Sequence, residues 1–421
     1  MKILFVQPPV YDFACHDFWM KPYGFLRLAG LFRAAGHVIE WFDFLDRSAS
    51  DCPSRLSASH PDGRGRYPRR TVVKPAIFSA VPRMFKRYGR DSDVFSGFVN
   101  ARGPFDAVFL TCTMTYWYLG VAEIAARFSG VPVYVGGGYA TLCAEHARSL
   151  GVIPVSFKEL PQFLASFGIG AGALETAQPA WDVYPQLPYV AARMSWGCPR
   201  RCSYCAIGQF SDGFTVREPQ TVADEVNTAL RPETMNVAFY DDALLANSDA
   251  LFDVCGRILS RKQVSFHTPN GVAVNAITSD VARELNRHRF GTLFLGYEVS
   301  DNSLQRRTGG KTSDEAFQQA AAVLRGAGFQ PGQIYVYLLL GHDLVPPATV
   351  AQGIRQVLAA GFLPSLSEFS PIPGTPDGDR LLPPGSDPLL TNNSAWTLRW
   401  AAPHTVQRLK DLAHQRDAVW R

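Results

Sequence analysis

Three cysteines lie within eight residues of one another: Cys198, Cys202 and Cys205, in the run Cys-Pro-Arg-Arg-Cys-Ser-Tyr-Cys. Cysteine thiolates hold iron–sulfur clusters, and a C-x3-C-x2-C run supplies three ligands to a cluster of four irons. The fourth iron would keep an open position, as catalytic metal sites do for their substrates. A zinc site of the common kind needs a fourth Cys or His at a matching spacing, and none follows within twenty residues.

The cysteine run follows an apolar stretch, Tyr189–Trp196, that is expected to form a strand. With an aromatic residue, Tyr204, directly before the last cysteine, the run resembles the signature of the radical S-adenosylmethionine (SAM) superfamily. The resemblance implies that Cys198, Cys202 and Cys205 hold a [4Fe–4S] cluster and that SAM binds the open iron, close to Tyr204. Reductive cleavage of SAM would then give a 5′-deoxyadenosyl radical.

Six strand–helix units can be recognised from residue 189 onward. The expected strands are 189–196, 235–241, 264–270, 292–298, 333–340 and 366–370, and the helices 219–230, 248–262, 278–288, 313–327 and 347–360. The resemblance implies the partial (β/α)6 TIM-like barrel of radical SAM enzymes over 171–376. Outside the resemblance, the helical pattern at 404–419 predicts a C-terminal helical cap at 377–421. Active sites of such barrels lie at the carboxyl ends of the strands.

Polar residues follow several of these strands. Asp241 and Asp242 end the second strand, and carboxylates suit the binding of an ammonium group. The resemblance implies that they hold the SAM amino group, that Glu298 contacts its ribose or amino acid moiety, and that Pro371 lies near its adenine. Gly341–Asp343 stands where the family usually has a Gly-Leu-Pro-Gly-like turn. Each carboxylate taken alone could instead be a helix N-cap or a surface ion pair.

Strands also alternate with helices in the first part of the chain. The expected strands are 2–6, 37–42, 107–111, 131–135 and 152–157, and the helices 22–35, 116–129 and 139–150. This order predicts a doubly wound, Rossmann-like parallel sheet, whose ligands bind beyond the carboxyl ends of the strands. Thr111 and Thr113 lie at one such end, and Gly136, Gly137 and Gly138 lie at another. The glycines would let a ligand approach the backbone closely, although a plain tight turn explains them equally well.

Four segments of this domain, Pro8-Pro9, Pro22–Ala29, Gly36-His37 and Val135–Thr141, resemble the cobalamin (B12)-binding domain that precedes the barrel in one class of radical SAM enzymes. The resemblance implies a cobalamin-binding domain at 1–170, with the threonines and glycines above as cofactor contacts. The Asp-x-His-x-x-Gly motif that supplies a lower cobalt ligand is absent, and an exposed or core histidine is the better explanation of His16.

The two resemblances together imply a cobalamin-dependent methyltransferase acting on an unactivated carbon of a small molecule or peptide. The alternative is a radical SAM enzyme that keeps the cobalamin-type fold but catalyses a cyclisation, a rearrangement or another group transfer from SAM. Either enzyme requires an external one-electron reductant of the flavodoxin or ferredoxin type. A non-catalytic corrinoid- or redox-sensing protein would leave the cysteine run without a purpose.

An insertion at 47–104 interrupts the first domain. Between Arg64 and Arg90 it carries nine Lys and Arg residues and no acid, so it is either a solvated flap or a lid or docking surface for an anionic substrate. The formal charge of the 421 residues is only +4, which makes nucleic acid an unlikely partner.

Apolar runs of membrane-spanning length and a signal peptide are not found in the sequence, so we expect a cytoplasmic protein without a membrane span. Its eight cysteines are then metal ligands and buried thiols rather than disulfides.

Overall fold

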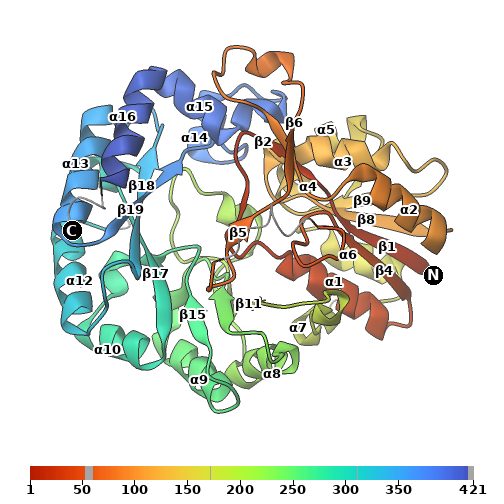
Figure 1. Ribbon diagram of the computed structural model, residues 1–421, viewed down its shortest axis with the longest axis horizontal. Helices are drawn as coiled ribbons and strands as arrows, with labels where there is room; N and C mark the ends of the chain where they lie inside the picture. Colours follow the sequence, from red (N-terminus) through yellow and green to blue (C-terminus); the bar gives the residue numbers. More distant parts are fainter. Residues whose placement is uncertain (53–59, 171, 311, 416–421) are drawn as a thin grey trace. The chain divides into compact units, whose positions relative to one another are not determined.

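The computed structural model describes residues 1–52, 60–170, 172–310 and 312–415. The chain divides into two compact units, and Figure 1 shows their elements. The first unit consists of Met1–Val190 with Ala229–Thr234 and Pro384–Asn392. The second consists of Ala191–Thr228, Met235–Pro383 and the chain from Asn393 onward. The functional domain limits at 170 and 376 stay predictions.

The first unit contains a sheet of five parallel strands in the order β10-β9-β8-β1-β4. Their bounds are β1 Lys2–Gln7, β4 Val38–Asp43, β8 Ala107–Thr111, β9 Val133–Gly136 and β10 Ile153–Pro154. In order along the chain this is a 2-1-3-4-5 sheet, one of the two common doubly wound arrangements. The predicted fold of this domain is therefore confirmed.

Alternate residues of these strands face opposite sides of the sheet, and aromatic side chains fill both sides. On one side Phe5 packs on Phe25 of α1 (Tyr23–Ala34), with ring centroids 5.0 Å apart. On the other side Phe42 packs on Phe95 of α2 (Ser92–Arg102), with ring centroids 4.9 Å apart. A fully buried Phe contributes about 1.5–3 kcal/mol, so these contacts hold helices on both faces.

The helices of this unit are short. They are α1 Tyr23–Ala34, α2 Ser92–Arg102, α3 Tyr118–Ala125, α4 Gly138–Leu142, α5 Ala144–Ser149, α6 Leu160–Ser166 and α7 Ala173–Thr176. The sequence predicted one helix at 139–150, which was wrong. The backbone leaves the helical region at Cys143, where φ is −131° and ψ is 41°, and two helices result.

The described part of the basic insertion contains three short strands, and the choice between a solvated flap and a lid stays a prediction. β2 (Val10–Asp12), β7 (Lys86–Tyr88) and β6 (Arg69–Thr71) make a three-stranded antiparallel sheet. β3 (His16–Asp17) pairs with β5 (Gly65–Arg66). The loop that follows β1 is thereby joined to the insertion by two sets of backbone pairs.

The second unit is built on parallel strands in the order β11-β14-β15-β17-β18-β19, with β16 paired to β17. Their bounds are β11 Tyr189–Ala192, β14 Asn236–Phe239, β15 Ser265–His267, β16 Val272–Ala273, β17 Phe290–Glu298, β18 Ile334–Leu340 and β19 Leu363–Glu368. Each of the six predicted strands has a counterpart, but the first, predicted at 189–196, ends at Ala192, and β19 begins three residues earlier than expected. The sheet is open between β11 and β19, which confirms a partial barrel.

Helices α8 (Pro219–Ala229), α9 (Ser248–Leu259), α10 (Ser279–Arg287), α12 (Asp314–Gly326) and α13 (Pro347–Ala359) line the outside of this curved sheet (Figure 1). The other described helices of this unit are α11 Asn302–Arg307, α14 Pro376–Leu381, α15 Asn393–Trp400 and α16 Pro403–His414. The last predicted helix, 404–419, ends partly outside the described residues. Within the described ranges, none of the helices has the length and apolar character needed to cross a membrane.

Candidate active site

The cysteine loop leaves β12 (Ser195–Trp196), a short strand that pairs with β13 (Thr215–Val216). Within it, the backbone N–H of Cys205 donates to the Cys202 carbonyl at 3.1 Å, which makes a tight turn between these ligands. Cys198 and Cys202 are partly buried, and Cys205 is exposed. Across the described chain, no three His, Cys, Asp or Glu side chains are placed to share a single metal ion. A four-iron cluster takes its three thiolates on separate irons, so the loop fits that group by its donors.

Gly309, directly after α11 and Thr308, packs against the cysteine loop. A Cβ at Gly309 would lie 2.8 Å from Cys202 Cα and 3.0 Å from its Sγ, and the φ of Gly309 is +129°. The Thr308 carbonyl accepts a hydrogen bond from the Ser203 backbone N–H at 3.4 Å. Only glycine can occupy this position without displacing a predicted cluster ligand.

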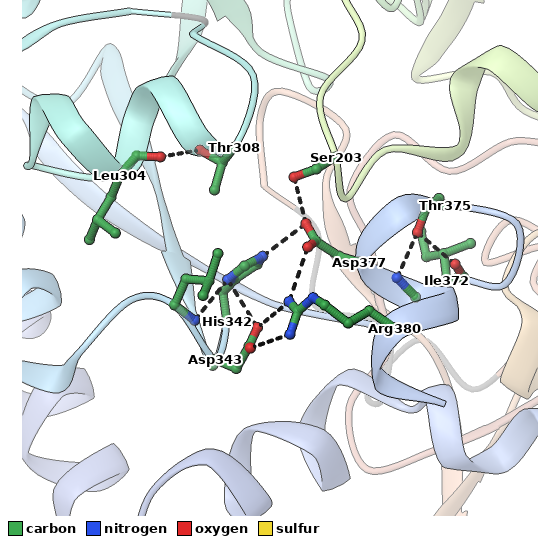
Figure 2. A network of polar contacts seen from close by, with 12 residues as sticks. Ser203, Leu304, Thr308, His342, Asp343, Ile372, Thr375, Asp377 and Arg380 are labelled. Atoms are coloured by element: carbon green, nitrogen blue, oxygen red, sulfur yellow. Dashed lines mark hydrogen bonds and ion pairs between the residues drawn. The ribbon is translucent and has the colours of Figure 1, made fainter. Parts of the chain in front are cut away.

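A buried carboxylate, Asp377 at the start of α14, holds the same loop from another direction (Figure 2). Its Oδ2 accepts a hydrogen bond from Ser203 Oγ at 2.5 Å, and its backbone N–H donates to the Ser203 carbonyl at 3.1 Å. His342 Nε2 lies 3.1 Å from the same Oδ2, and Arg380 Nη2 lies 3.1 Å from Oδ1. Hydrogen bonds from Ser203, His342 and Arg380 hold the pKa of Asp377 below its ordinary value against the effect of its burial.

His342 is completely buried, at the turn after β18. The Leu344 backbone N–H donates to its Nδ1 at 3.2 Å, so Nε2 carries the proton that faces Asp377. Asp343, the next residue, forms an ion pair with Arg380 at 2.6 Å. The turn that departs from the family pattern in sequence therefore builds the charge network that supports the cysteine loop.

Asp241, which follows β14 in the chain, is buried beside the first residue of β12. Its Oδ1 accepts hydrogen bonds from the backbone N–H of Ser195 at 2.6 Å and from Ser195 Oγ at 2.5 Å, and Met194 N donates at 3.1 Å. Burial raises its pKa. The neighbouring Asp242 forms an ion pair with Arg193. Both carboxylates thus have protein partners that position the strand before the cysteines, and their contact with a SAM amino group stays a prediction.

Glu298 and Tyr204 line one pocket with Tyr297, Gln305, Thr308 and Thr312. Glu298 has a φ of +69°, and the pairing of β17 with β18 shifts register there. A non-glycine residue in this conformation costs of order 1–3 kcal/mol, and such residues cluster at functional sites. Burial, with the nearby Glu298 carboxylate, raises the pKa of Tyr204, so its phenol stays protonated as a hydrogen-bond donor.

Pro371 begins a turn that ends in the N-cap of α14. Thr375 Oγ1 accepts from the Gly378 N–H at 3.0 Å, and a Cβ at Gly378 would lie 1.8 Å from the Ile372 carbonyl oxygen (Figure 2). Gln209 Nε2 donates to the Gly374 carbonyl at 3.0 Å. Pro371 itself is buried, so the turn is fixed beside the segment that follows the cysteines.

In the first unit, a pocket lies between the carboxyl ends of β1 and β8, where the chain order of the sheet reverses. Thr111 and Thr113 line it, together with Gln7, Pro8, Pro9, Val10, Cys112 and Trp117. Trp117 Nε1 donates to Asp12 Oδ2 at 2.9 Å, which fixes the indole in place. This is the position at which doubly wound sheets bind ligands.

The three glycines after β9 differ in what they allow. Gly136 pairs with Thr111, and a Cβ there would meet nothing within 4 Å, so its surroundings are open to a ligand. Gly137 has a φ of +91°, and a Cβ on it would lie 2.6 Å from the Cys112 carbonyl oxygen. Gly138 begins α4. The structure therefore brings the predicted threonines and glycines to one edge of the sheet.

Sequence reasoning missed the residues that support the cysteine loop through tertiary contacts. Gly309 and Asp377 were not predicted to have any role, and His342 attracted attention only as a departure from the family turn. The Gly309-Gly310 pair after a polar segment was a usable signal of close backbone approach. Asp377 gave none, because an acid in the first turn of a helix is common.

Comparison with known proteins decides the identity of the barrel. Residues 194–350 match the model of the Radical SAM superfamily. This segment is a radical SAM domain. No curated protein matches the sequence.

Solved structures share the fold over most of the chain, and TsrM and OxsB are two of them. The radical SAM methyltransferase TsrM from Kitasatospora setae, with tryptophan substrate and a SAM analogue bound, superposes with a TM-score of 0.62 at 14% identity, over 90% of this chain and 75% of TsrM. The cobalamin-dependent SAM radical enzyme OxsB gives 0.56 at 10% identity, over 97% of this chain and 56% of OxsB. The chain thus spans little more than half the length of OxsB. At these identities the likeness establishes the fold.

Proposed function

We propose that this radical SAM enzyme is a cobalamin-dependent methyltransferase acting on an unactivated carbon. The observation that carries the proposal is the pairing of two sites in one chain. One is a three-cysteine loop on a radical SAM barrel, and the other is an open pocket at the switch point of a five-stranded doubly wound sheet. TsrM, named as a radical SAM methyltransferase, has the same fold and has been seen with cobalamin and a [4Fe–4S] cluster.

The residues of the barrel fit a cluster and SAM. Cys198, Cys202 and Cys205 would hold the [4Fe–4S] cluster, since Gly309 keeps space against Cys202 and the loop faces solvent at Cys205. Glu298 offers a carboxylate and Tyr204 a protonated phenol to the polar groups of SAM. When bound, these cofactors supply the 5′-deoxyadenosyl radical, and cobalamin supplies the methyl group.

The switch-point pocket fits cobalamin without a histidine ligand. Gly136 leaves the backbone open, and Thr111 and Thr113 offer hydroxyls at the same edge. None of the residues lining the pocket is a histidine. His16 is exposed and lies on β3, paired with Arg66. We therefore expect bound cobalamin to have no histidine of this chain on its lower face.

The partners are part of the proposal. A flavodoxin- or ferredoxin-type protein would supply the electron, because SAM cleavage is reductive and consumes one electron. The substrate would be a small molecule or peptide that carries an anionic group.

The product mass tests the reaction. The reconstituted enzyme, supplied with SAM, cobalamin, reductant and a candidate substrate, should release 5′-deoxyadenosine and a product heavier by one methylene group. Cys202→Ala should release neither. A product that has lost two hydrogens, or is unchanged in mass, would instead support the alternative reactions.

A further inference from the structure

Two groups of basic residues in and beside the insertion differ in their partners, and the first group is neutralised by acids. Four of them form ion pairs with acids of the same unit: Arg47 with Asp17 at 2.9 Å, Arg64 with Asp62 at 2.7 Å, Arg87 with Glu123 at 2.8 Å and Arg90 with Asp51 at 2.7 Å. Arg87 is almost completely buried, and the others are at most about one-fifth exposed. These pairs account for how the insertion is held to the sheet.

The second group has no acidic partner among the described residues. It consists of Arg66 on β5, Arg69 and Arg70 on β6, and Lys86 on β7. The three arginines are exposed, and Lys86 is partly buried. Asp12 lies opposite Lys86 in the register of β2 and β7, but its carboxylate oxygens accept hydrogen bonds from Trp117 and Asn392.

The unbalanced cations lie close together, around His16. Arg66 pairs with His16 between β5 and β3, and on the neighbouring sheet Arg69 and Lys86 occupy adjacent strands. Burial is the largest cause that lowers the pKa of His16, and the charges of Arg66, Arg69 and Lys86 lower it further. Burial likewise lowers the pKa of Lys86 most, and the charges of Arg69 and Arg83 add to this effect. Like charges held this close destabilise the folded protein unless an anion joins them.

We propose that His16, Arg66, Arg69 and Lys86 form an oxyanion site that binds the phosphate or carboxylate group of the enzyme's substrate. Arginine and lysine bind these groups through charge-assisted hydrogen bonds, and neutral His16 adds a ring N–H. The site deepens the proposed function and rests on it for the identity of the ligand as substrate.

The position of the site favours a small ligand. β3 lies in the segment that follows the carboxyl end of β1, and doubly wound sheets bind small ligands beyond that edge. A nucleic acid would call for cations spread along a groove together with aromatic side chains for stacking. Here the cations are confined to two short strand pairs, and the whole chain has a formal charge of only +4.

Pyrophosphate binding to the full-length protein, measured by isothermal titration calorimetry, tests the site. We expect saturable binding near one per chain, weakened about tenfold or more in Arg69→Gln and in Lys86→Gln. The matched control is Arg283→Gln, which removes an exposed arginine of α10 in the second unit and should bind like the wild type. Circular dichroism confirms that each variant is folded. Absence of saturable binding, or an equal loss in Arg283→Gln, would overturn the site.

Three further probes separate the ligand classes. Citrate should compete with pyrophosphate if the site takes carboxylates as well as phosphates; if it does not, the site is specific for phosphate. Single-stranded DNA and an acidic flavodoxin are titrated as rival ligands of the same cations. Binding of either that is lost in Lys86→Gln, without pyrophosphate binding, would overturn the small-ligand proposal. Because these titrations need neither iron nor cobalt, their failure leaves the methyltransferase proposal untouched.

Discussion

At the scale of single residues, the candidate active site depends on groups that contact the cysteine loop from distant parts of the chain. Ser203 lies between two predicted cluster ligands and is bonded to Thr308 and Asp377. Gly309 is pressed against Cys202. The loop has a backbone turn of its own at Cys202–Cys205, and these neighbours add contacts that position its thiolates.

The substitution Asp377→Asn should weaken the contacts that position the cysteine loop. An amide nitrogen would face Arg380 or His342 in place of an acceptor, and a buried unsatisfied group costs about 1–3 kcal/mol. We expect less iron retained after anaerobic reconstitution and gel filtration, with a broadened electron paramagnetic resonance signal of the reduced cluster. Asp280→Asn, at an exposed ion pair on α10, is the control. Identical iron content and spectra in the two variants would refute a positioning role for Asp377.

Gly309→Ala should have a larger effect on the cluster. The added Cβ would lie within 3.0 Å of Cys202 Cα, and the φ of +129° is strained for alanine. We expect iron binding to fall strongly, whereas Gly310→Ala, where a Cβ would meet nothing within 4 Å, should keep more of it. Iron assays on both variants measure this effect on the cluster. Retention of full iron in Gly309→Ala would show that the cysteine loop adapts to the added methyl group.

At the scale of elements, the sequence predicted most of what the backbone does. The strands of both sheets are short apolar runs between glycines and prolines, so β1, β8 and β18 lie within a residue or two of their predicted bounds. The prediction of one helix at 139–150 was wrong because nothing in the composition of this segment marks the break at Cys143. α11 and β16 were missed because both are too short to show a period.

The residues of the candidate sites also divide into those that the local sequence reveals and those that it does not. The cysteines form a local run, and the threonines and glycines follow recognisable strands, so their types and spacing could be read directly. Asp377, His342 and Gly309 act through contacts between residues 35 to 174 positions apart, and no local pattern records such contacts. Asp241 could be predicted to matter, but its bonds to Ser195 could not.

A substitution at Gly136, at the carboxyl end of β9, tests where cobalamin binds. Gly136→Ala should fold as the wild type does, because a Cβ there meets nothing within 4 Å, but its methyl group would occupy space proposed for the corrin. We expect weaker cobalamin binding, measured by absorbance titration, at an unchanged melting temperature. Gly97→Ala, on α2, adds a methyl group that likewise meets nothing within 4 Å and serves as the control. Equal cobalamin affinity in both variants would place the corrin elsewhere.

At the scale of the whole molecule, buried charge makes stability depend on pH. Asp43, at the carboxyl end of β4, is buried, and burial raises its pKa from 3.8 to about 6. Tyr184 and the Leu45 N–H donate to its carboxylate at 2.6 and 2.7 Å. Between pH 4 and 6 the folded protein keeps a proton that the unfolded chain has lost. The free energy of unfolding therefore falls as pH rises through this window.

Asp43→Asn should remove this dependence, because the amide can accept from Leu45 and donate to Tyr184 without titrating. The rise in the pKa of Asp43 corresponds to about 3 kcal/mol of unfolding free energy. The wild type should lose this stability between pH 4 and 7, and the variant should not. Urea unfolding at a series of pH values measures it. Parallel curves for the two proteins would contradict an unfavourable buried charge at Asp43.

The most direct test of the central claim is metal analysis of the full-length protein, purified anaerobically with cobalamin present and reconstituted with iron and sulfide. We expect about four irons and about one cobalt per chain, with the absorbance of a corrinoid beside that of the cluster. Cys202→Ala should lose the iron and keep the cobalt. Four irons without cobalt would contradict a cobalamin-dependent enzyme and leave the first unit's pocket to another ligand.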